Sequence, residues 1–293
     1  MLLITRLPFS GLSSPGHILR KAYNVSALSD AEAFLRPAGS SHPGVTYLSL
    51  NRPKTKNAIS VNLLQQFRDC LEHVSVDKDT RVLVVNSTSD NAFCSGADLI
   101  ERKSMTKAQV DKFLKDLRSA FSGLEKLPFP TIAAIDGPAL GGGLEMALSC
   151  DLRVAGFSVT KIGLTETKLG IIPGAGGTQR LTRLIGIPRA KDLIFTARAM
   201  TAHQAFDYGV IDYVSEEGET GLDRALRLAG EISVNGPLAV RAAKQAISRA
   251  MEFPLEAGLD FERASYEPLL HSKDRLEALE AFKAKRPPQF KGE

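Results

Sequence analysis

The stretch Asp136-Gly-Pro-Ala-Leu-Gly-Gly-Gly-Leu-Glu145-Met-Ala-Leu-Ser-Cys-Asp151 decides the expected fold and the expected site of this 293-residue chain. The apolar run TIAAIDG (131–137) leads into it and predicts a buried strand. The glycines at 141–143 predict a turn, and the apolar residues after them predict a helix to about residue 149. Because glycine has no side chain, peptide N–H groups at the start of this helix can come close to a ligand. Those N–H groups and the helix dipole favour negative charge.

The same alternation of strands and helices continues on both sides of this stretch. Upstream, GVTYLSLNRP (44–53) alternates apolar and polar residues as a half-buried strand does, and RVLVVNS (81–87) is typical of a second strand. LRVAG (152–156) predicts a strand downstream. Strands separated by helices predict an α/β fold with a largely parallel sheet. Between the first two strands Ser60 can cap a helix with one apolar face, formed by Leu63, Leu64, Phe67, Leu71 and Val74.

The two ends of the chain differ from this core in composition. Residues 1–29 carry three basic residues and five serines but no acidic residue, which is typical of a mitochondrial transit peptide and predicts the mitochondrial matrix. A merely disordered N-terminus is the alternative. We expect a linker over 30–43 and a core over 44–196. Helical patterns dominate 197–293, and we expect this region to pack on the core or on another subunit.

Charge and composition exclude several classes of function. The net charge is 37 minus 33, or +4, and residues 1–29 supply +3 of it, which leaves +1 for the remainder. Such a remainder gives no electrostatic case for nucleic-acid binding. No run approaches the roughly 18 apolar residues of a membrane-spanning helix. Cys70, Cys94 and Cys150 show no CxxC spacing and the five histidines no HExxH pair, so we expect free thiols and no catalytic metal.

The glycine turn suits either a phosphate or a carbonyl oxygen that gains negative charge during a reaction. A phosphate loop would need GKS or GKT after the glycines, or GxGxxG after the first strand. Here Glu145 stands in the first helical turn and would repel a phosphate. We therefore favour the oxyanion, with a purely structural turn as the alternative.

Two further segments carry candidate groups. FCSGADL (93–99) brings backbone amides of small residues to a loop after a strand, although an ordinary turn with Asp98 as a helix cap is the alternative. In IGLTETKLGIIPGAGGTQRL (162–181), Glu166 has apolar neighbours and is a candidate buried carboxylate. The alternative is an ion pair of Glu166 with Lys168 or Arg180.

Four motifs in this order resemble those of the enoyl-CoA hydratase/isomerase (crotonase) family. They are Asn51-Arg-Pro with Lys56-Asn57-Ala58, FCSGADL, DGPALGGGLE (136–145) and TETKLGIIPGAGGTQRL (165–181). The resemblance runs from about residue 44 to the C-terminus and implies a crotonase-like spiral of repeated ββα units with a C-terminal helical trimerisation region. It also implies an acyl-CoA substrate, a homotrimer or homohexamer, and no cofactor, because CoA is part of the substrate.

The resemblance also implies roles for individual residues. The backbone N–H groups of Ala97 and Gly142 would form an oxyanion hole around the thioester oxygen. Glu145 and Glu166 would flank the double bond, with Glu145 activating water and Glu166 protonating Cα. The implied substrate and CoA contacts are Lys56, Ala58, Ser95, Gly96, Ala97, Asp98, Leu99, Gly142 and Lys285.

Three other readings compete with a hydratase. One is an enoyl-CoA isomerase or another acyl-CoA enzyme on the same scaffold; isomerases can work with one carboxylate, so the presence of two favours hydration. A non-catalytic member would be expected to lack a glutamate or an oxyanion glycine, and neither is missing. One hydratase of the family also binds AU-rich RNA through lysines of its first helix. The matching positions here hold Val61, Gln65 and Asp69, so we do not expect RNA binding.

The acyl group is the least determined part of the expected substrate. TIAAIDG, GLTETKLGIIPG (163–174) and KRPPQFKGE (285–293) are most similar to the branch of the family that hydrates 3-methylglutaconyl-CoA in leucine degradation, and a short-chain enoyl-CoA is the other substrate. A methylglutaconyl group ends in a carboxylate that needs a cationic or hydrogen-bonding partner. The sequence alone does not identify that partner.

Overall fold

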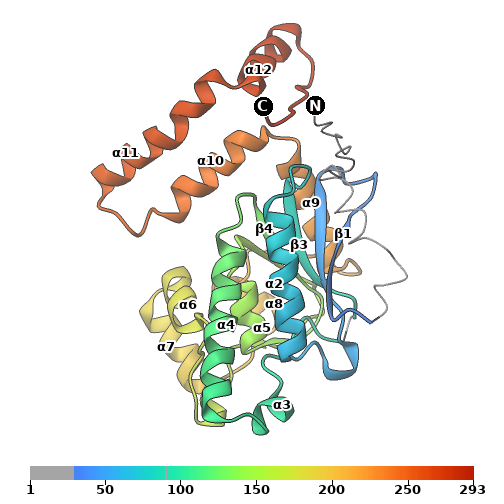
Figure 1. The fold of residues 1–293 in the computed structure, drawn as a ribbon, viewed down its shortest axis with the longest axis vertical. Helices are drawn as coiled ribbons and strands as arrows, with labels where there is room; N and C mark the ends of the chain where they lie inside the picture. The colour runs from blue at the N-terminus through green and yellow to red at the C-terminus, as the bar shows by residue number, and fades with distance from the viewer. Residues whose placement is uncertain (1–29, 90) are drawn as a thin grey trace, which may run out of the picture.

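A six-stranded sheet forms the centre of the protein in the computed structural model, which describes residues 30–89 and 91–293 (Figure 1). The expected transit peptide, residues 1–29, lies outside the described residues. The outermost pair, β1 and β2, is antiparallel and every other neighbouring pair is parallel, which confirms the largely parallel sheet. In spatial order the strands are β1 (Ala33–Pro37), β2 (Val45–Leu50), β3 (Val82–Ser87), β4 (Thr131–Ile135), β6 (Leu152–Ala155) and β8 (Tyr213–Val214).

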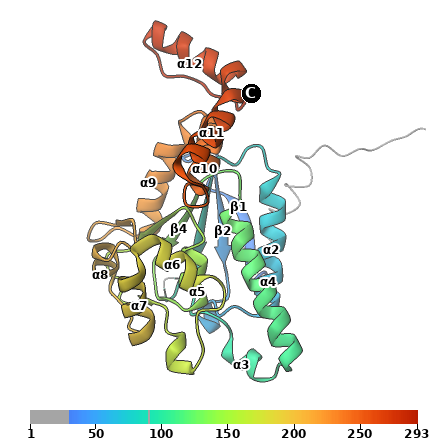
Figure 2. The same cartoon turned by 90° about the vertical axis from the view of Figure 1, so that its left-hand side faces the viewer.

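Helices cover both faces of this sheet (Figure 2). Leu48 and Leu50 of β2 belong to the main apolar core, with α2 (Val61–Ser75) and α4 (Lys107–Glu125). Val45 and Tyr47 of the same strand lie in a second apolar cluster, with α9 (Gly221–Ser233). The prediction of a half-buried β2 is therefore wrong, because all six of its residues are buried.

The chain also forms a second, smaller layer of extended segments, separate from the central sheet. Here β5 (Ala139–Leu140) pairs with β7 (Ile162–Gly163), and single bridges join Ile59 to Ala97 and Cys94 to Ala139. After each of β2, β3, β4 and β6, the chain thus adds one short extended segment to this layer before its next helix. The expected repetition of ββα units is confirmed, and the loops of successive units meet at the second layer.

The expected linker over 30–43 contains β1, so that prediction is wrong. β1 pairs along its whole length with β2, and its Ala33 and Leu35 are buried in the main core. An edge strand accepts a proline such as Pro37 because one side of the strand needs no sheet partner. In the sequence, the apolar residues of β1 form only a short run that is soon followed by Pro37 and Gly39, which is a composition typical of a connection.

The boundary expected at residue 196 also does not match the packing. β8 completes the central sheet and α9 covers one of its faces, although both follow α7 (Ile187–Thr196) and α8 (Ala202–Asp207). Only the last helices, α10 (Pro237–Ser248), α11 (Leu255–Tyr266) and α12 (Lys273–Ala284), extend away from the sheet (Figure 1). They carry exposed apolar side chains, including Ile247 and Phe282. No helix within the described ranges has the length and apolar character to cross a membrane.

Candidate active site

A cavity of about 580 Å³ opens where the loops of the second layer meet the helices. Three short elements supply its walls: α3 (Leu99–Lys103), α5 (Gly142–Ala147) and the 3-10 turn η3 (Glu166–Leu169). A second cavity, of about 660 Å³, lies beside α10, but its Lys244 and Asp151 already form an ion pair of 2.7 Å. The first cavity is the candidate site because it holds carboxyl and amide groups without such partners.

Glu145 projects from α5 and is held firmly by the glycine loop that follows η3. Its Oε1 accepts hydrogen bonds from the backbone N–H groups of Ala175 and Gly177, both at 2.8 Å. Burial raises the pKa of Glu145, while these two N–H groups and the charge of Arg180 act in the opposite direction. The donors therefore orient the carboxyl group and favour its ionised form against the effect of burial.

Glu166, at the start of η3, is in a different environment: the backbone N–H groups of Glu166 itself and of Thr165 lower its pKa, but by less than its surroundings raise it. Its Oε2 is buried and accepts no hydrogen bond from any described residue. Burial, and next the charge of Glu145, raise the pKa of Glu166 to about 7. The alternative of an ion pair with Arg180 is wrong, because Arg180 pairs with Glu125 at 2.8 Å. Glu166 is thus a carboxyl group that keeps its proton to near-neutral pH.

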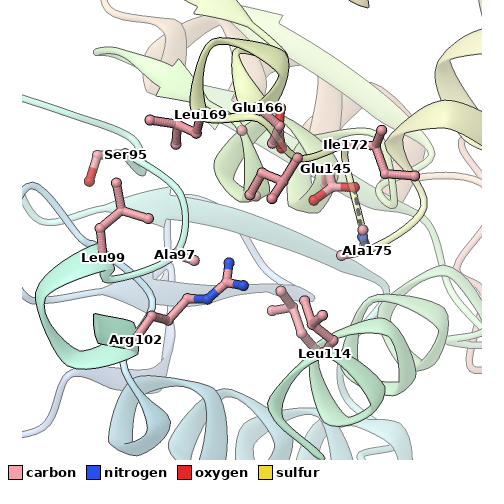
Figure 3. A pocket seen from close by; sticks show the side chains of 15 residues that line it. Ser95, Ala97, Leu99, Arg102, Leu114, Glu145, Glu166, Leu169, Ile172 and Ala175 are labelled. Carbon is pink, nitrogen blue, oxygen red and sulfur yellow. Dashed lines mark hydrogen bonds between the residues drawn. The ribbon is translucent and has the colours of Figure 1, made fainter. Parts of the chain in front are cut away.

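Gly141 allows the two carboxyl groups to share one site (Figure 3). A Cβ atom at Gly141 would lie 3.2 Å from Oε1 of Glu166, so glycine lets this carboxyl group approach the start of α5. Its φ of +52° and ψ of −124° also disfavour any residue with a side chain. Two neighbouring carboxyl groups cannot ionise independently, and their proton losses are driven to different pH values.

Two unpaired backbone N–H groups lie next to each other on the same cavity. Ile59 donates to the carbonyl of Gly96 at 2.7 Å and accepts from the N–H of Asp98 at 3.0 Å, which leaves the N–H of Ala97 on the opposite side of this bridge. The N–H of Gly142 belongs to the first turn of α5, where no helical acceptor exists. A Cβ atom at Gly142 would lie 3.6 Å from the nitrogen of Ala97. Neither N–H donates a hydrogen bond within the described part of the chain.

The other expected contact residues fall into three groups. Ser95 and Leu99 line the cavity, as Ala97 and Gly142 do. The second group does not line the cavity but stabilises the loop that does. In this group Asp98 caps α3 and pairs with Arg52 at 2.7 Å, and Gly96 has a φ of +94°. The backbone carbonyl of Lys56 accepts a hydrogen bond from the N–H of Ser95, and that of Ala58 accepts one from the side chain of Arg52. Lys285 follows α12, which lies at the opposite end of the molecule from α3, and it is not among the residues that line this cavity (Figure 1).

One polar lining residue was not predicted from the sequence. Arg102 of α3 faces the cavity three residues after Leu99, at the spacing that places two side chains on one face of a helix. The sequence signal that could have identified Arg102 is its helical spacing from Leu99, the last residue of FCSGADL. The sequence does not show, however, which face of this five-residue helix lines a cavity. Leu114 of α4 and Ile172 complete the apolar walls.

Comparison with known proteins shows the family of this chain. The family model described as enoyl-CoA hydratase/isomerase matches residues 40–293. The chain belongs to the enoyl-CoA hydratase/isomerase family. It is 53% identical to the enoyl-CoA isomerase/hydratase of Mycosarcoma maydis, over 89% of this chain and 98% of that protein. It is 46% identical to the mitochondrial methylglutaconyl-CoA hydratase of Mus musculus, over 94% and 88%.

A solved structure confirms the fold of this family member. The crystal structure of an enoyl-CoA hydratase from Bacillus anthracis is 45% identical and covers 89% of this chain and 100% of its own, with a TM-score of 0.86. The crotonase fold expected from the four motifs is therefore the fold of this chain. The family is enzymatic, which agrees with a cavity that holds both glutamates.

Proposed function

We propose that this enzyme adds water across the double bond of an α,β-unsaturated acyl-CoA. The observation that carries the proposal is the meeting of two carboxyl groups, Glu145 and Glu166, with the two unpaired N–H groups of Ala97 and Gly142 on one cavity. Hydration needs two proton transfers and a place for negative charge on the thioester oxygen. This cavity offers a group for each of those tasks.

The environments of the two glutamates support a division of labour. Glu145, oriented by two N–H donors, takes a proton from water as the water oxygen forms its bond to Cβ. The electron pair of the double bond moves to the thioester, and the N–H groups of Ala97 and Gly142 stabilise the resulting enolate oxygen. One such donor contributes about 3 kcal/mol to lowering a barrier. Glu166, protonated to about pH 7, gives its proton to Cα, and the thioester carbonyl forms again.

Two relatives support a narrower choice of substrate. The mouse relative is named a methylglutaconyl-CoA hydratase and the Mycosarcoma relative an isomerase/hydratase, so we assign 3-methylglutaconyl-CoA or a short-chain enoyl-CoA as the substrate. The CoA portion is part of the substrate, and no separate cofactor enters the mechanism. The mouse relative is mitochondrial by name, and residues 1–29 have a transit-peptide composition, so the mitochondrial matrix is the assigned location.

The assigned assembly is a homotrimer or homohexamer. The exposed apolar side chains of α10 to α12, including Ile247 and Phe282, favour contact with another subunit. No catalytic metal is assigned, and within residues 30–89 and 91–293 no cluster of acidic, histidine or cysteine side chains has a metal-binding arrangement. RNA binding is not assigned, since Val61, Gln65 and Asp69 give the exposed face of α2 no basic patch.

Ultraviolet absorbance separates hydration from isomerisation. Hydration of crotonyl-CoA removes the conjugated enoyl thioester, so its absorbance should fall when the purified full chain is added. An isomerase would instead raise the absorbance of a 3-enoyl-CoA as its double bond moves into conjugation. An enzyme that only moves the double bond, and leaves crotonyl-CoA unchanged, would contradict the proposed function.

A further inference from the structure

Arg102 is the one cationic side chain among the described residues that line the active-site cavity. Figure 3 shows its guanidinium group pointing into the cavity between Ala97 and Leu114, across from Glu145 and Glu166. The proposed hydration uses the two glutamates and two backbone amides, and it gives no task to a cation. The position of Arg102 therefore requires a separate explanation.

No described residue neutralises this guanidinium group. Within residues 30–89 and 91–293, the Arg102 side chain forms no hydrogen bond and no ion pair. The nearest acidic residues in the sequence are engaged elsewhere: Asp98 pairs with Arg52, and Glu101 accepts the backbone N–H of Val61 at 2.9 Å. By contrast, Arg180, close to the same cavity, pairs with Glu125. The cavity thus contains a half-buried cation that lacks an anion.

The walls around Arg102 strengthen its preference for an anionic ligand. Leu99, Leu114 and Leu117 line this part of the cavity, and each supplies only apolar surface. A neutral ligand would remove water from the guanidinium group without replacing its hydrogen bonds, which is unfavourable. A carboxylate fits better, because its two oxygens match the two parallel N–H donors of arginine.

The backbone at Arg102 is held in place relative to Ala97. It lies five residues after Ala97, whose N–H is assigned to the thioester oxygen, and both belong to one short segment. Asp98 holds this segment by accepting the N–H groups of Ile100 and Glu101 at 3.0 and 3.1 Å, and by its ion pair with Arg52. The backbone that carries the cation is therefore held next to the residue assigned to the thioester end of the acyl chain.

We propose that Arg102 binds a carboxylate at the far end of the acyl chain, so that the preferred substrates are α,β-unsaturated thioesters of dicarboxylic acids. The inference rests on the proposed hydratase function and adds a specificity-determining residue to it. It accounts for a cation in the cavity of an enzyme whose chemistry needs only acids, bases and amide donors. The competing role for Arg102 is contact with the phosphates of CoA, which would be the same for every acyl group.

A matched pair of substrates tests the inference. Glutaconyl-CoA carries a terminal carboxylate where trans-2-pentenoyl-CoA carries a methyl group, and the two molecules are otherwise alike. We expect Arg102→Met to lower kcat/KM for glutaconyl-CoA by about 10- to 100-fold, the effect of losing a charge-assisted hydrogen-bonded pair. For pentenoyl-CoA, kcat/KM should stay within about threefold of wild type, since its methyl group makes no ion pair.

Two further variants complete the experiment. Arg102→Lys keeps the charge but loses the paired donors, so its kcat/KM for glutaconyl-CoA should fall between those of wild type and Arg102→Met. Lys103→Met removes the neighbouring exposed cation of the same helix and should leave both substrates unaffected. An equal loss for both substrates in Arg102→Met would overturn the inference, as would a wild type that hydrates pentenoyl-CoA but not glutaconyl-CoA. Failure of wild type with both substrates would instead reject the hydratase function itself.

Discussion

The two carboxyl groups of the cavity stand on segments of opposite character. Every residue of α5, which carries Glu145, is buried, whereas none of the four residues of η3, which carries Glu166, is. Glu145 accepts two backbone N–H groups, and Oε2 of Glu166 accepts none. The comparison shows how one side-chain type can provide a base and an acid: burial raises the pKa of both groups, Ala175, Gly177 and Arg180 oppose this at Glu145, and the charge of Glu145 adds to it at Glu166.

Removal of the supported carboxylate should have the largest effect. Glu145→Gln can keep the hydrogen bonds from Ala175 and Gly177 through its amide oxygen, but it cannot accept a proton from water. We expect kcat for crotonyl-CoA hydration to fall by about a thousandfold or more. Unchanged circular dichroism would verify the fold, and a rate near that of wild type would remove Glu145 from the mechanism.

Removal of the Glu166 carboxyl group should lower kcat somewhat less. Glu166→Gln cannot protonate Cα, although Glu145, the bound water and the oxyanion amides remain, so we expect kcat to fall by about a hundredfold. Wild type should exchange the Cα proton of a saturated acyl-CoA in D2O, which proton NMR can follow, and the variant should lose this exchange. A variant that retains full hydration and exchange activity would show that Glu166 only fills space.

The orientation of Glu145 can also be disturbed without replacing either carboxyl group. A Cβ atom at Gly177 would lie 3.0 Å from Oε1 of Glu145 and 2.9 Å from both Leu164 and Pro173, so Gly177→Ala must displace the loop that orients Glu145. We expect kcat to fall about tenfold and the protein to lose about 1–3 kcal/mol of stability. The control is Gly230→Ala on α9, where no atom lies within 4 Å and activity should be unchanged.

The smallest expected effect concerns stability as a function of pH. Burial and Glu145 raise the pKa of Glu166 from 4.5 to about 7 in the folded protein. Between these values the unfolded chain releases the proton first, so the raised pKa makes stability fall as pH rises from 4.5 to 7. Glu166→Gln lacks this loss, and its melting temperature relative to wild type should rise over this interval, by on the order of a few degrees.

A matched surface variant controls that measurement. Glu72 is exposed on α2, and Glu72→Gln should keep the pH dependence of wild type. If Glu166→Gln and wild type lost stability in parallel from pH 4.5 to 7, Glu166 would not be the group that titrates there.

Much of the fold could be predicted because its signals are local. β3, β4, β6 and α2 follow from apolar runs, helical spacing and the Ser60 cap, whose side chain accepts the N–H of Leu63. β1 and β8 could not, since each depends on a partner elsewhere in the chain. β8 is only two residues long and pairs with β6, some sixty positions earlier. The complete burial of β2 likewise depends on α9, which follows the last strand of the sheet in the sequence.

The site shows the same limit. The motifs predicted Glu145, Glu166, Ala97 and Gly142 as site residues, because glycine turns and carboxylates between apolar residues can be recognised in the sequence. The difference between the glutamates was not predictable, since it depends on which carboxyl group meets the loop at Ala175 and Gly177. Arg102 was missed because its importance comes from the direction in which α3 faces.

The pH dependence of kcat/KM for crotonyl-CoA hydration tests the central claim most directly, because it reports the protonation states that the free enzyme needs. If Glu166 is the acid, kcat/KM should fall as pH rises above about 7, where burial and Glu145 have placed its pKa. This descending limb should be absent from the residual activity of Glu166→Gln. A wild-type profile that rises through pH 7 to a plateau would contradict the account, because hydration would then require Glu166 in its ionised form.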